Sequence, residues 1–421
     1  MSNTRHVAIV GAGFGGLGVA EQLGHVPVEV TLIDRHNYHT FQPLLYQVAT
    51  SLLNAEDVGA PVRSMFRHQD NVTFRMATVT GIDTAGQNIQ LDDGQKISYE
   101  YLVLAGGATV NYFNTPGAAE HAFPLYTLAN AIKLRNRILE RFEAADRNPA
   151  LIEDGALNFV IVGAGPTGVE TAGALSDLFY NLLPRDYHDL ATEKARVILV
   201  EMGKEVLAPF KDNLRTYAKQ ELEQRRVEVR LEQAVAEVGG TFVRLKSGEE
   251  IKAHTLIWAA GVRANPLADM LKSPLGRGGR IKLNPDLSVL DHPEIFVVGD
   301  MGEVASDGNV LPQLGSVAMQ SGEHVGRQIA RRLHGDPGQP FKYWDKGFMA
   351  TIGRGAAVVE FPNKRTLDGP LAYFAWLGVH LALLSGIRNR IETLWNWGWS
   401  ALTHDRAARI IIESKDDELK T

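Results

Sequence analysis

Near its start the chain reads VAIVGAGFGGLG (residues 7–18), an apolar run that passes into closely spaced glycines and then into helix-forming residues. This order predicts a strand, a tight turn and a helix. Gly11 would form the turn, Gly13 would let backbone N–H groups approach a pyrophosphate, and Gly16 would let the helix pack closely on the strand. The phosphate would lie at the positive end of the helix dipole. The stretch therefore predicts a dinucleotide-binding unit.

A second predicted strand supports this interpretation. It covers residues 28–33 and ends on Asp34, where a carboxylate can accept hydrogen bonds from an adenosine ribose. The alternative is an ordinary strand-to-helix turn followed by a solvated aspartate. The order of strand, glycines, helix, strand and acid favours the dinucleotide.

The composition is that of a globular protein, and it excludes several functions. With 421 residues the chain is too long for one compact core and indicates two or three domains. Its 43 basic and 49 acidic residues give a net charge of −6, which argues against general nucleic-acid binding. It has no cysteine, so disulfides, cysteine-ligated metal centres and a redox-active dithiol are excluded, and we expect no metal site. The first six residues lack the apolar core of a signal peptide, and we expect a cytoplasmic protein.

Several further segments are predicted after the first two strands. Residues 35–49 are rich in aromatic and amide side chains and predict a loop that leads into a helix. Short alternating runs over residues 72–91 predict a small antiparallel excursion. Residues 99–104 predict a buried strand, and the small residues after it would let the backbone approach a ligand. A long helix is predicted over residues 128–146.

The opening pattern recurs as FVIVGAGPTGVE at residues 159–170, so the chain contains a duplicated fold. The second strand of the repeat, residues 197–200, also ends on an acid, Glu201. A carboxylate there favours a free 2′-hydroxyl and repels a 2′-phosphate, so we expect NADH rather than NADPH. Residues 227–251 predict a hairpin-like stretch, and residues 255–262 predict an apolar strand with a glycine end, as in the first unit.

Together these features resemble the flavoproteins with two dinucleotide-binding domains, and among them the type II NADH:quinone oxidoreductases, the single-subunit, non-pumping NADH dehydrogenases. The resemblance covers essentially the full length. It is most specific at residues 34–49, at GAGPTGVE (163–170), at VGD (298–300) and in the apolar C-terminal segment. It implies an α/β fold with two Rossmann-like domains, glutathione-reductase-like, in which the NADH-binding domain interrupts the FAD-binding domain, followed by membrane-associated amphipathic helices.

The resemblance implies where these domains lie. The FAD-binding domain would consist of residues 1–118 and 279–345, and the NADH-binding domain of residues 119–278. Residues 346–421 would form a membrane-anchoring or dimerisation region.

The resemblance also implies the residues that hold the two cofactors. FAD would be held by the first glycine turn, its acid and the ends of later strands, namely Gly11, Gly13, Phe14, Gly15, Gly16, Asp34, Arg35, Ala105, Gly106, Gly299, Asp300 and Ala318. Thr40, Gln42 and Pro43 would line its isoalloxazine ring. NADH would be held by the second turn, its acid and the end of the matching strand, namely Gly163, Gly165, Pro166, Thr167, Gly168, Glu170, Glu201, Ala260 and Gly261.

Three side chains are implied to act in catalysis. Glu170 matches an acid that the family places between nicotinamide and flavin, and the alternative is a helix-start glutamate stabilised by the helix dipole. The family's quinone-site pattern Ala-Gln-x-Ala-x-Gln aligns with GSVAMQ at residues 315–320. Ala318 and Gln320 match, whereas a glycine and Ser316 replace the first alanine and glutamine, which leaves open how the acceptor is held. For Gln320 the alternative is a capping or interhelical amide near the flavin.

The C-terminal segment predicts association with a membrane surface. Residues 371–387 are apolar, at the short limit for crossing a bilayer, and contain a histidine and two glycines, so we expect a helix that lies on the membrane. Beyond them apolar residues recur at helical spacing between Ile391 and Leu402. Flanking arginines suit an anionic leaflet, and tryptophans suit its headgroup region, namely Arg388, Arg390, Arg406, Arg409, Trp395, Trp397 and Trp399. A buried dimer interface is the alternative, and both uses can share these helices.

The implied function is that of a peripheral enzyme on the cytoplasmic face of the membrane, acting as a homodimer. It would transfer hydride from NADH to FAD and two electrons to a membrane quinone, without pumping protons. Disulfide reductases, peroxide-type NADH oxidases and sulfide:quinone enzymes of this architecture need cysteines, which the chain lacks. The alternatives are a soluble ferredoxin- or rubredoxin-type reductase and a non-enzymatic, FAD-stabilised membrane-associated protein.

Overall fold

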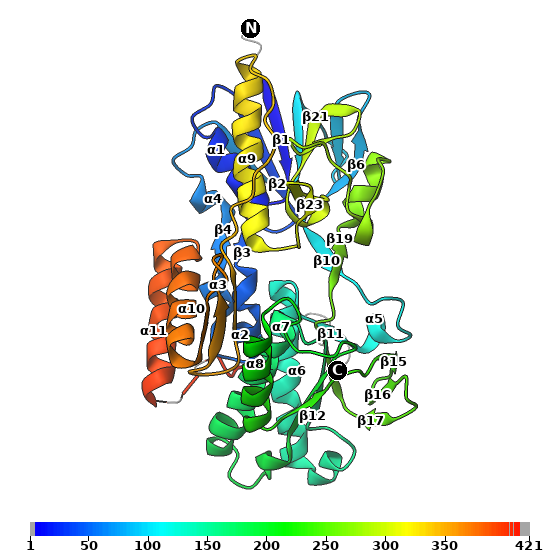
Figure 1. Ribbon diagram of the computed structural model, residues 1–421, viewed down its shortest axis with the longest axis vertical. Coiled ribbons are helices and arrows are strands. Elements are labelled where there is room, and N and C mark those ends of the chain that lie inside the picture. The colour runs from blue at the N-terminus through cyan, green and yellow to red at the C-terminus, as the bar shows by residue number, and fades with distance from the viewer. Residues whose placement is uncertain (1–4, 404, 407, 413–421) are drawn as a thin grey trace. The chain divides into compact units, whose positions relative to one another are not determined.

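The computed structural model describes residues 5–403, 405–406 and 408–412, which form two compact units (Figure 1). Unit 1 comprises the described residues of 1–40, 60–110 and 262–345. Unit 2 comprises those of 41–59, 111–261 and 346–421. These units divide the chain at other positions than the expected functional domains. The assignment of those domains stays a prediction, and part of its first and last segments lies outside the described residues.

Unit 1 is organised around a six-stranded sheet in the order β20-β21-β9-β1-β2-β5. Its members are β1 (His6–Val10), β2 (Glu29–Asp34), β5 (Val72–Met76), β9 (Tyr101–Leu104), β20 (Ser288–Val289) and β21 (His292–Val297). All neighbours are parallel except β20 and β21. Helices α1 (Phe14–Leu23) and α9 (Gly315–Leu333) pack against each other (Figure 1). Alternate residues of β1 enter two separate apolar clusters, because both faces of a parallel sheet are covered.

The expected antiparallel excursion is present, but its predicted start was wrong. Residues Val72–Met76 form β5, which pairs in parallel with β2. The excursion consists of β6 (Val79–Asp83), β7 (Asn88–Leu91) and β8 (Lys96–Ser98). An edge strand that is covered less on one side alternates in polarity as an antiparallel strand does, and this explains the error.

Unit 2 repeats the plan with a five-stranded parallel sheet in the order β11-β18-β12-β13-β14. Its members are β11 (Phe123–Pro124), β12 (Asn158–Val162), β13 (Arg196–Val200), β14 (Val227–Arg230) and β18 (Thr255–Trp258). The helices are α6 (Leu128–Arg147), which confirms the predicted long helix, α7 (Pro166–Asp177) and α8 (Asp212–Gln224). The predicted hairpin-like stretch over residues 227–251 was wrong for its first strand, because β14 belongs to the parallel sheet. The antiparallel part consists of β15 (Val235–Val238), β16 (Phe242–Leu245) and β17 (Glu250–Lys252).

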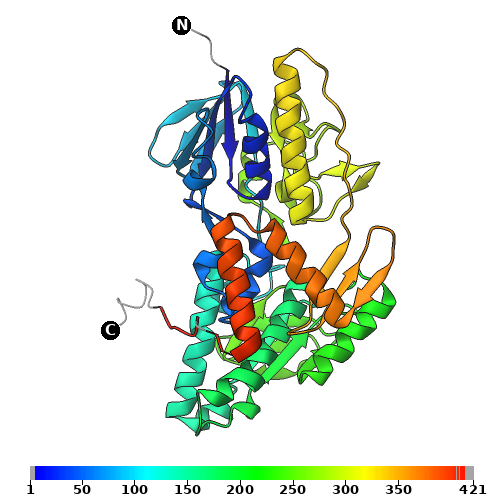
Figure 2. The same cartoon turned by 90° about the vertical axis from the view of Figure 1, so that its left-hand side faces the viewer.

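The C-terminal part of unit 2 is a small antiparallel sheet followed by two helices. The sheet consists of β24 (Phe348–Thr351), β25 (Ala357–Glu360) and β26 (Thr366–Asp368). Helices α10 (Gly369–Leu383) and α11 (Ile387–Thr403) contact each other, and in Figure 2 they diverge from the end at which they are connected. The apolar run expected to be one helix over 371–387 breaks at Gly386, whose φ is +86°. Among the residues that the structure describes, no helix is both long and apolar enough to cross a bilayer.

Short elements complete the chain. They are β3 (Tyr38–Thr40), α2 (Leu45–Ala49), α3 (Ala55–Val58), β4 (Gly59–Pro61), α4 (Val62–Met65), β10 (Ala108–Val110), α5 (Ala118–His121), β19 (Val262–Ala264), β22 (Ala305–Ser306) and β23 (Asn309–Val310). The expected loop leading into a helix over 35–49 is thus β3, a 3₁₀ turn at Gln42–Leu44 and α2.

Candidate functional site

The first glycine turn lies at the carboxyl edge of the sheet in unit 1. Gly11 has a φ of +109°, and a side chain there would lie 2.3 Å from the carbonyl oxygen of Ala105. A Cβ on Gly16 would lie 1.8 Å from the carbonyl oxygen of Gly11. Gly13 is different, because it is exposed and nothing lies within 4 Å of where its Cβ would be. Two glycines are therefore required by packing, and the third leaves the start of α1 open to a ligand.

The carboxylate of Asp34 stabilises this turn. Its Oδ2 accepts the backbone N–H of Ala12 at 2.7 Å, and its Oδ1 accepts the backbone N–H of His36 at 2.8 Å. An ionised carboxylate oxygen has two lone pairs, so Oδ2 keeps one for a ribose hydroxyl, whereas the imidazole of His36 lies 3.7 Å from Oδ1. The same acid can therefore hold the turn and recognise the ligand.

The second glycine turn, in unit 2, has the same geometry. Gly163 has a φ of +100°, and a Cβ on Gly168 would lie 1.8 Å from the carbonyl oxygen of Gly163. Gly165 has nothing within 4 Å. Glu201 Oε2 accepts the backbone N–H of Ala164 at 2.7 Å, while Oε1 accepts the N–H of Gly203 at 2.6 Å. The two units therefore contain glycine turns of matching geometry, each held by a carboxylate.

Unit 1 brings several predicted residues close to the first turn. Gly299, with a φ of +65°, has its N–H bonded to Ser321 Oγ at 3.1 Å, and a Cβ on it would lie 3.0 Å from that of Ala318. A Cβ on Gly15 would lie 3.3 Å from the carbonyl oxygen of Ala318. Gly106 donates its N–H to Met301 Sδ at 3.1 Å. These contacts bring Gly299 and Ala318 against the first helix and place Gly106 beside the turn that follows β21.

Asp300 follows Gly299 in the same region. Burial raises the pKa of its carboxyl to about 6, and the nearby guanidinium of Arg280 opposes that shift. A hydroxyl-rich ligand that hydrogen-bonded to the carboxylate would compensate part of its desolvation.

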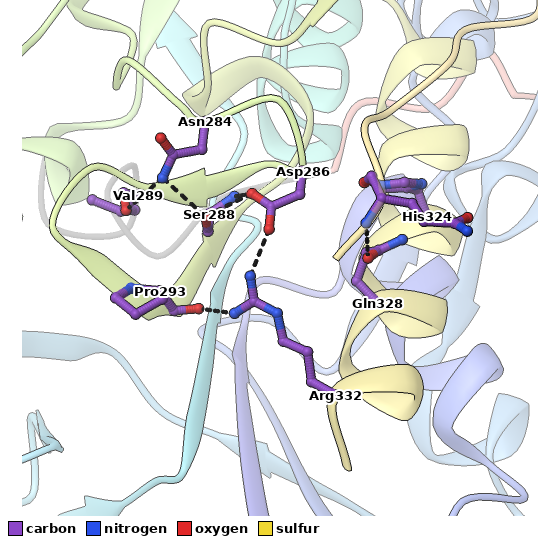
Figure 3. Close-up of polar contacts among 9 residues, drawn as sticks. Asn284, Asp286, Ser288, Val289, Pro293, His324, Gln328 and Arg332 are labelled. Atoms are coloured by element: carbon purple, nitrogen blue, oxygen red, sulfur yellow. Dashed lines mark hydrogen bonds and ion pairs between the residues drawn. The ribbon is translucent and has the colours of Figure 1, made fainter. Parts of the chain in front are cut away.

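Helix α9 carries Ser316, Ala318 and Gln320 near its start. Near its end, Arg332 anchors the helix to the sheet (Figure 3). Arg332 donates to Asp286 Oδ2 at 2.5 Å and to the carbonyl oxygen of Pro293, and its guanidinium lies 4.7 Å from the centre of the Phe296 ring. This anchor fixes the helix relative to the strand end that precedes Asp300.

The side chains of Ser316 and Gln320 are bound to the segment that follows α9. Gln320 Nε2 donates to the carbonyl oxygen of Trp344 at 3.0 Å, and its Oε1 accepts the N–H of Trp344 at 2.9 Å. Ser316 Oγ lies 2.9 Å from the hydroxyl of Tyr343. Their role toward a quinone stays a prediction. In this conformation both side chains instead contact Tyr343 and Trp344, which lie later in the same unit. A Cβ on Gly315 would lie 3.5 Å from the Phe14 ring, an ordinary van der Waals contact, so the alanine of the family pattern would also fit at this position.

Glu170 lies in α7, in the helical turn after the second glycine turn, and is 8% exposed. Burial raises the pKa of its carboxyl to about 8, although the N–H of Thr351, at 3.3 Å from Oε1, and the indole of Trp376 stabilise the carboxylate. A carboxylate stabilised by the helix dipole would have a lowered pKa. Desolvation therefore outweighs the dipole at this position.

The residues around Glu170 were not identified from the sequence. Tyr46 on α2 contacts Thr351 on β24, with 2.8 Å between Oη and Oγ1. Trp376 on α10 is fully buried, and its ring stacks on His380 with 3.9 Å between centroids. Burial lowers the pKa of His380 to about 4. The available signal was the spacing of Trp376 and His380, four residues apart on one helix face.

The remaining predicted residues are divided between the units. Arg35, which is exposed, and Thr40 belong to unit 1. Gln42 and Pro43 belong to unit 2, together with the second-turn residues Pro166 and Thr167, both exposed, and Ala260 and Gly261, which follow β18. Gln42 Nε2 donates to the carbonyl oxygen of Tyr126 at 3.4 Å.

Comparisons with known proteins agree over most of the chain. Residues 5–322 match the pyridine nucleotide-disulphide oxidoreductase family. Two Mycobacterium tuberculosis proteins named type II NADH:quinone oxidoreductase are similar, NdhA with 38% identity over 97% of this chain and 89% of its own, and Ndh with 36% identity over 98% and 91%. The solved structure of NDH2 from Plasmodium falciparum in complex with NADH has a TM-score of 0.88 at 19% identity, covering 98% of this chain and 100% of that chain. The shared fold thus includes both glycine turns.

Proposed function

The chain belongs to the pyridine nucleotide-disulphide oxidoreductase family and, within it, to the type II NADH:quinone oxidoreductases, and from that premise we propose how its residues divide the reaction. It is an FAD-dependent enzyme that oxidises NADH and reduces a quinone without pumping protons. When bound, FAD supplies the chemistry by accepting a hydride and giving up two electrons. The protein must bind, orient and shield the reacting groups.

Unit 1 holds FAD. Gly13 leaves room at the start of α1 for a pyrophosphate, and Oδ2 of Asp34 keeps a lone pair for the adenosine ribose. Asp300 and Gly106 serve the remaining part of the dinucleotide. The open space at Gly13 and the half-buried carboxylate of Asp300 fit a group with a pyrophosphate and several hydroxyls.

Unit 2 holds NADH at the second glycine turn. Glu201 braces that turn and would accept hydrogen bonds from the 2′-hydroxyl of the adenosine ribose. A 2′-phosphate would bring a second negative charge against the carboxylate, so NADH is preferred over NADPH. The presence of two cradles with matching turn geometry, one in each unit, is the observation that carries this division of labour.

Glu170 is the acid that acts next to the nicotinamide. Because its pKa is near 8, the carboxyl exchanges its proton close to neutral pH, which is the range where a general acid or base is most effective. Gln320, Ser316 and Ala318 lie on the acceptor side. The amide of Gln320 and the hydroxyl of Ser316 would bind a quinone oxygen after they release Trp344 and Tyr343. Alternatively, they would hold those two residues in position to contact the quinone.

The protein acts at the membrane surface, on the cytoplasmic face, and as a homodimer. Helices α10 and α11 carry large apolar side chains that are more than a third exposed, namely Leu371, Phe374, Val379, Leu383, Ile387, Ile391, Leu394, Trp395, Trp399 and Leu402. Many exposed large apolar side chains on two neighbouring helices are typical of a membrane or protein contact, and a lipid-soluble substrate requires access from the bilayer.

An anaerobic titration tests the whole assignment. NADH should remove the flavin absorbance of the purified holoenzyme, and a short-chain quinone should restore it. Bleaching that quinone does not reverse would overturn the acceptor side, and a protein that holds flavin but is not bleached by NADH would overturn the assignment to unit 2.

A further inference from the structure

A chain of buried hydrogen bonds leads from α11 to Glu170, entirely within unit 2. Trp397 Nε1 lies 2.7 Å from Gln47 Oε1, and Gln47 Nε2 lies 3.0 Å from the hydroxyl of Tyr46. That hydroxyl lies 2.8 Å from Thr351 Oγ1, and the N–H of Thr351 donates to Glu170. All five residues are less than 9% exposed. A polar chain at this depth is held in one arrangement, because every broken link would leave a buried group without a partner.

The chemistry of the first residue fixes the direction of the first two hydrogen bonds. An indole N–H only donates, so Trp397 requires the carbonyl end of the Gln47 amide to face it. The amide nitrogen of Gln47 then donates to the Tyr46 oxygen. In the next bond, between the hydroxyls of Tyr46 and Thr351, either oxygen can be the donor, and donation by Tyr46 is favoured because its proton would otherwise lack a partner among these residues. With Tyr46 as the donor, the side-chain dipoles of Gln47 and Tyr46 point their positive ends toward Thr351, whose backbone N–H donates to Glu170.

We propose that Trp397 is a positioning residue whose indole N–H, acting through Gln47, Tyr46 and Thr351, orients the dipoles around Glu170 from the surface helix α11. The inference builds on the proposed role of Glu170, but it concerns the proton on that carboxyl and can be tested without a quinone. It also makes the position of α11 against the rest of unit 2 part of the site.

Helix α11 is arranged for this coupling. Its Trp395 and Trp399 are 68% and 47% exposed, whereas Trp397, two positions from each, faces inward. On the same inner side Asn396 Nδ2 donates to Asp57 Oδ2 at 2.8 Å. One helix therefore presents a lipid-facing surface outward and the first donor of the chain inward.

Other titratable groups near Glu170 do not ionise in the same range. Burial, together with the charge of Glu170, raises the pKa of Tyr46 well above 10. Burial and the charge of Asp177 raise the pKa of Tyr373 on α10, while nearby arginines oppose this, namely Arg354, Arg406 and Arg225. His380 has a pKa of about 4 because of burial. A proton released near pH 8 in this region therefore belongs to Glu170.

The test follows the carboxyl stretch of protonated Glu170 by infrared spectroscopy of the holoenzyme as a function of pH, with Glu170→Gln identifying the band. Trp397→Phe keeps an aromatic ring but removes the donor, so the amide of Gln47 can turn and the dipoles lose their common direction. The carboxylate is then less stabilised, and the midpoint of the titration should rise by roughly half a pH unit or more. Trp395→Phe, on the outer side of α11, should leave the midpoint unchanged.

A double-mutant cycle separates the chain from a general loosening of the helix. Tyr46→Phe breaks the chain beyond Trp397, so adding Trp397→Phe to it should shift the midpoint no further. Additive shifts, or a Trp397→Phe midpoint equal to wild type, would overturn the proposal. If Trp397→Phe fails to fold, Gln47→Leu removes the next link and must raise the midpoint as well. Full quinone reduction by Glu170→Gln would overturn the role of Glu170 and leave these midpoints standing.

Discussion

Glu201 holds the backbone amide of Ala164 at 2.7 Å, the distance at which Asp34 holds that of Ala12 in the other unit. The longer side chain of the glutamate thus reaches the same position as the aspartate. In each unit the acid stabilises the glycine turn and would also bind the ribose. The stability of the turn and the selectivity for the nucleotide would therefore depend on one carboxylate.

Replacing Glu201 should therefore affect both binding and selectivity. Glu201→Ala removes the brace and the ribose acceptor, and we expect the KM for NADH to rise by about tenfold, the size of one lost charge-assisted hydrogen bond. Glu201→Gln keeps the size but removes the charge, so discrimination against NADPH should fall with a smaller loss of NADH affinity. Steady-state kinetics with both nucleotides would measure this, and selectivity unchanged in both variants would contradict the ribose role.

Gly16 and Gly13, both in the first turn, should respond differently to substitution by alanine. A methyl group on Gly16 would overlap the carbonyl oxygen of Gly11, so Gly16→Ala should destabilise unit 1 by at least about 2 kcal/mol. Gly13 has free space around it, so Gly13→Ala should fold normally but retain less FAD. Thermal unfolding of the apoprotein and the flavin content after purification would distinguish the two. Equal flavin content in wild type and Gly13→Ala would argue against pyrophosphate binding there.

Glu170 makes stability depend on pH. Its pKa in the folded protein, about 8, is higher than in the unfolded chain, so the folded state binds more protons between about pH 4 and 8. Stability therefore falls as pH rises through this window, by on the order of 2 to 5 kcal/mol in total. Glu170→Gln has no proton to lose, and its unfolding temperature should exceed that of wild type at pH 9 but not at pH 5. A constant difference at both values would contradict the raised pKa.

Much of the fold could be predicted from the sequence because its signals are local. The glycine turns and the acids after the second strands each lie within a short stretch, and the structure places them as the Rossmann pattern requires. Edge strands such as β5 were harder, because the sequence does not show which strand lies beside them. The expectation that Trp397 lies with Trp395 and Trp399 at a lipid surface was wrong. Positions two apart lie on opposite sides of a helix, so helical geometry alone could have corrected it.

Contacts between distant segments could not be predicted. Tyr46 and Thr351 are 305 positions apart, and the sequence of either segment is compatible with many partners. The amide of Gln320 is likewise bound to a segment whose return to α9 depends on the folded chain. Such pairs decide the surroundings of Glu170 and Gln320, and those surroundings cannot be found from the sequence next to either residue.

Removing the C-terminal region is a poor test of membrane binding, because Trp376 is fully buried beside Glu170 and a truncation after residue 370 would expose the core. Point substitutions on the outer surface avoid this problem. Ile391 and Leu402 on α11 are 63% and 85% exposed, so a charge there costs little within the folded protein.

Ile391→Glu and Leu402→Glu together should weaken binding to anionic vesicles at least about tenfold, since they remove apolar area from the bilayer and add charges that repel its surface. Met76→Glu, at a 61% exposed position in unit 1, is the matched control and should bind as wild type. Co-sedimentation would measure the binding, while bleaching by NADH should be retained in all three proteins. If the α11 variant instead sediments normally with vesicles but changes from dimer to monomer, these helices serve the dimer and the membrane surface lies elsewhere.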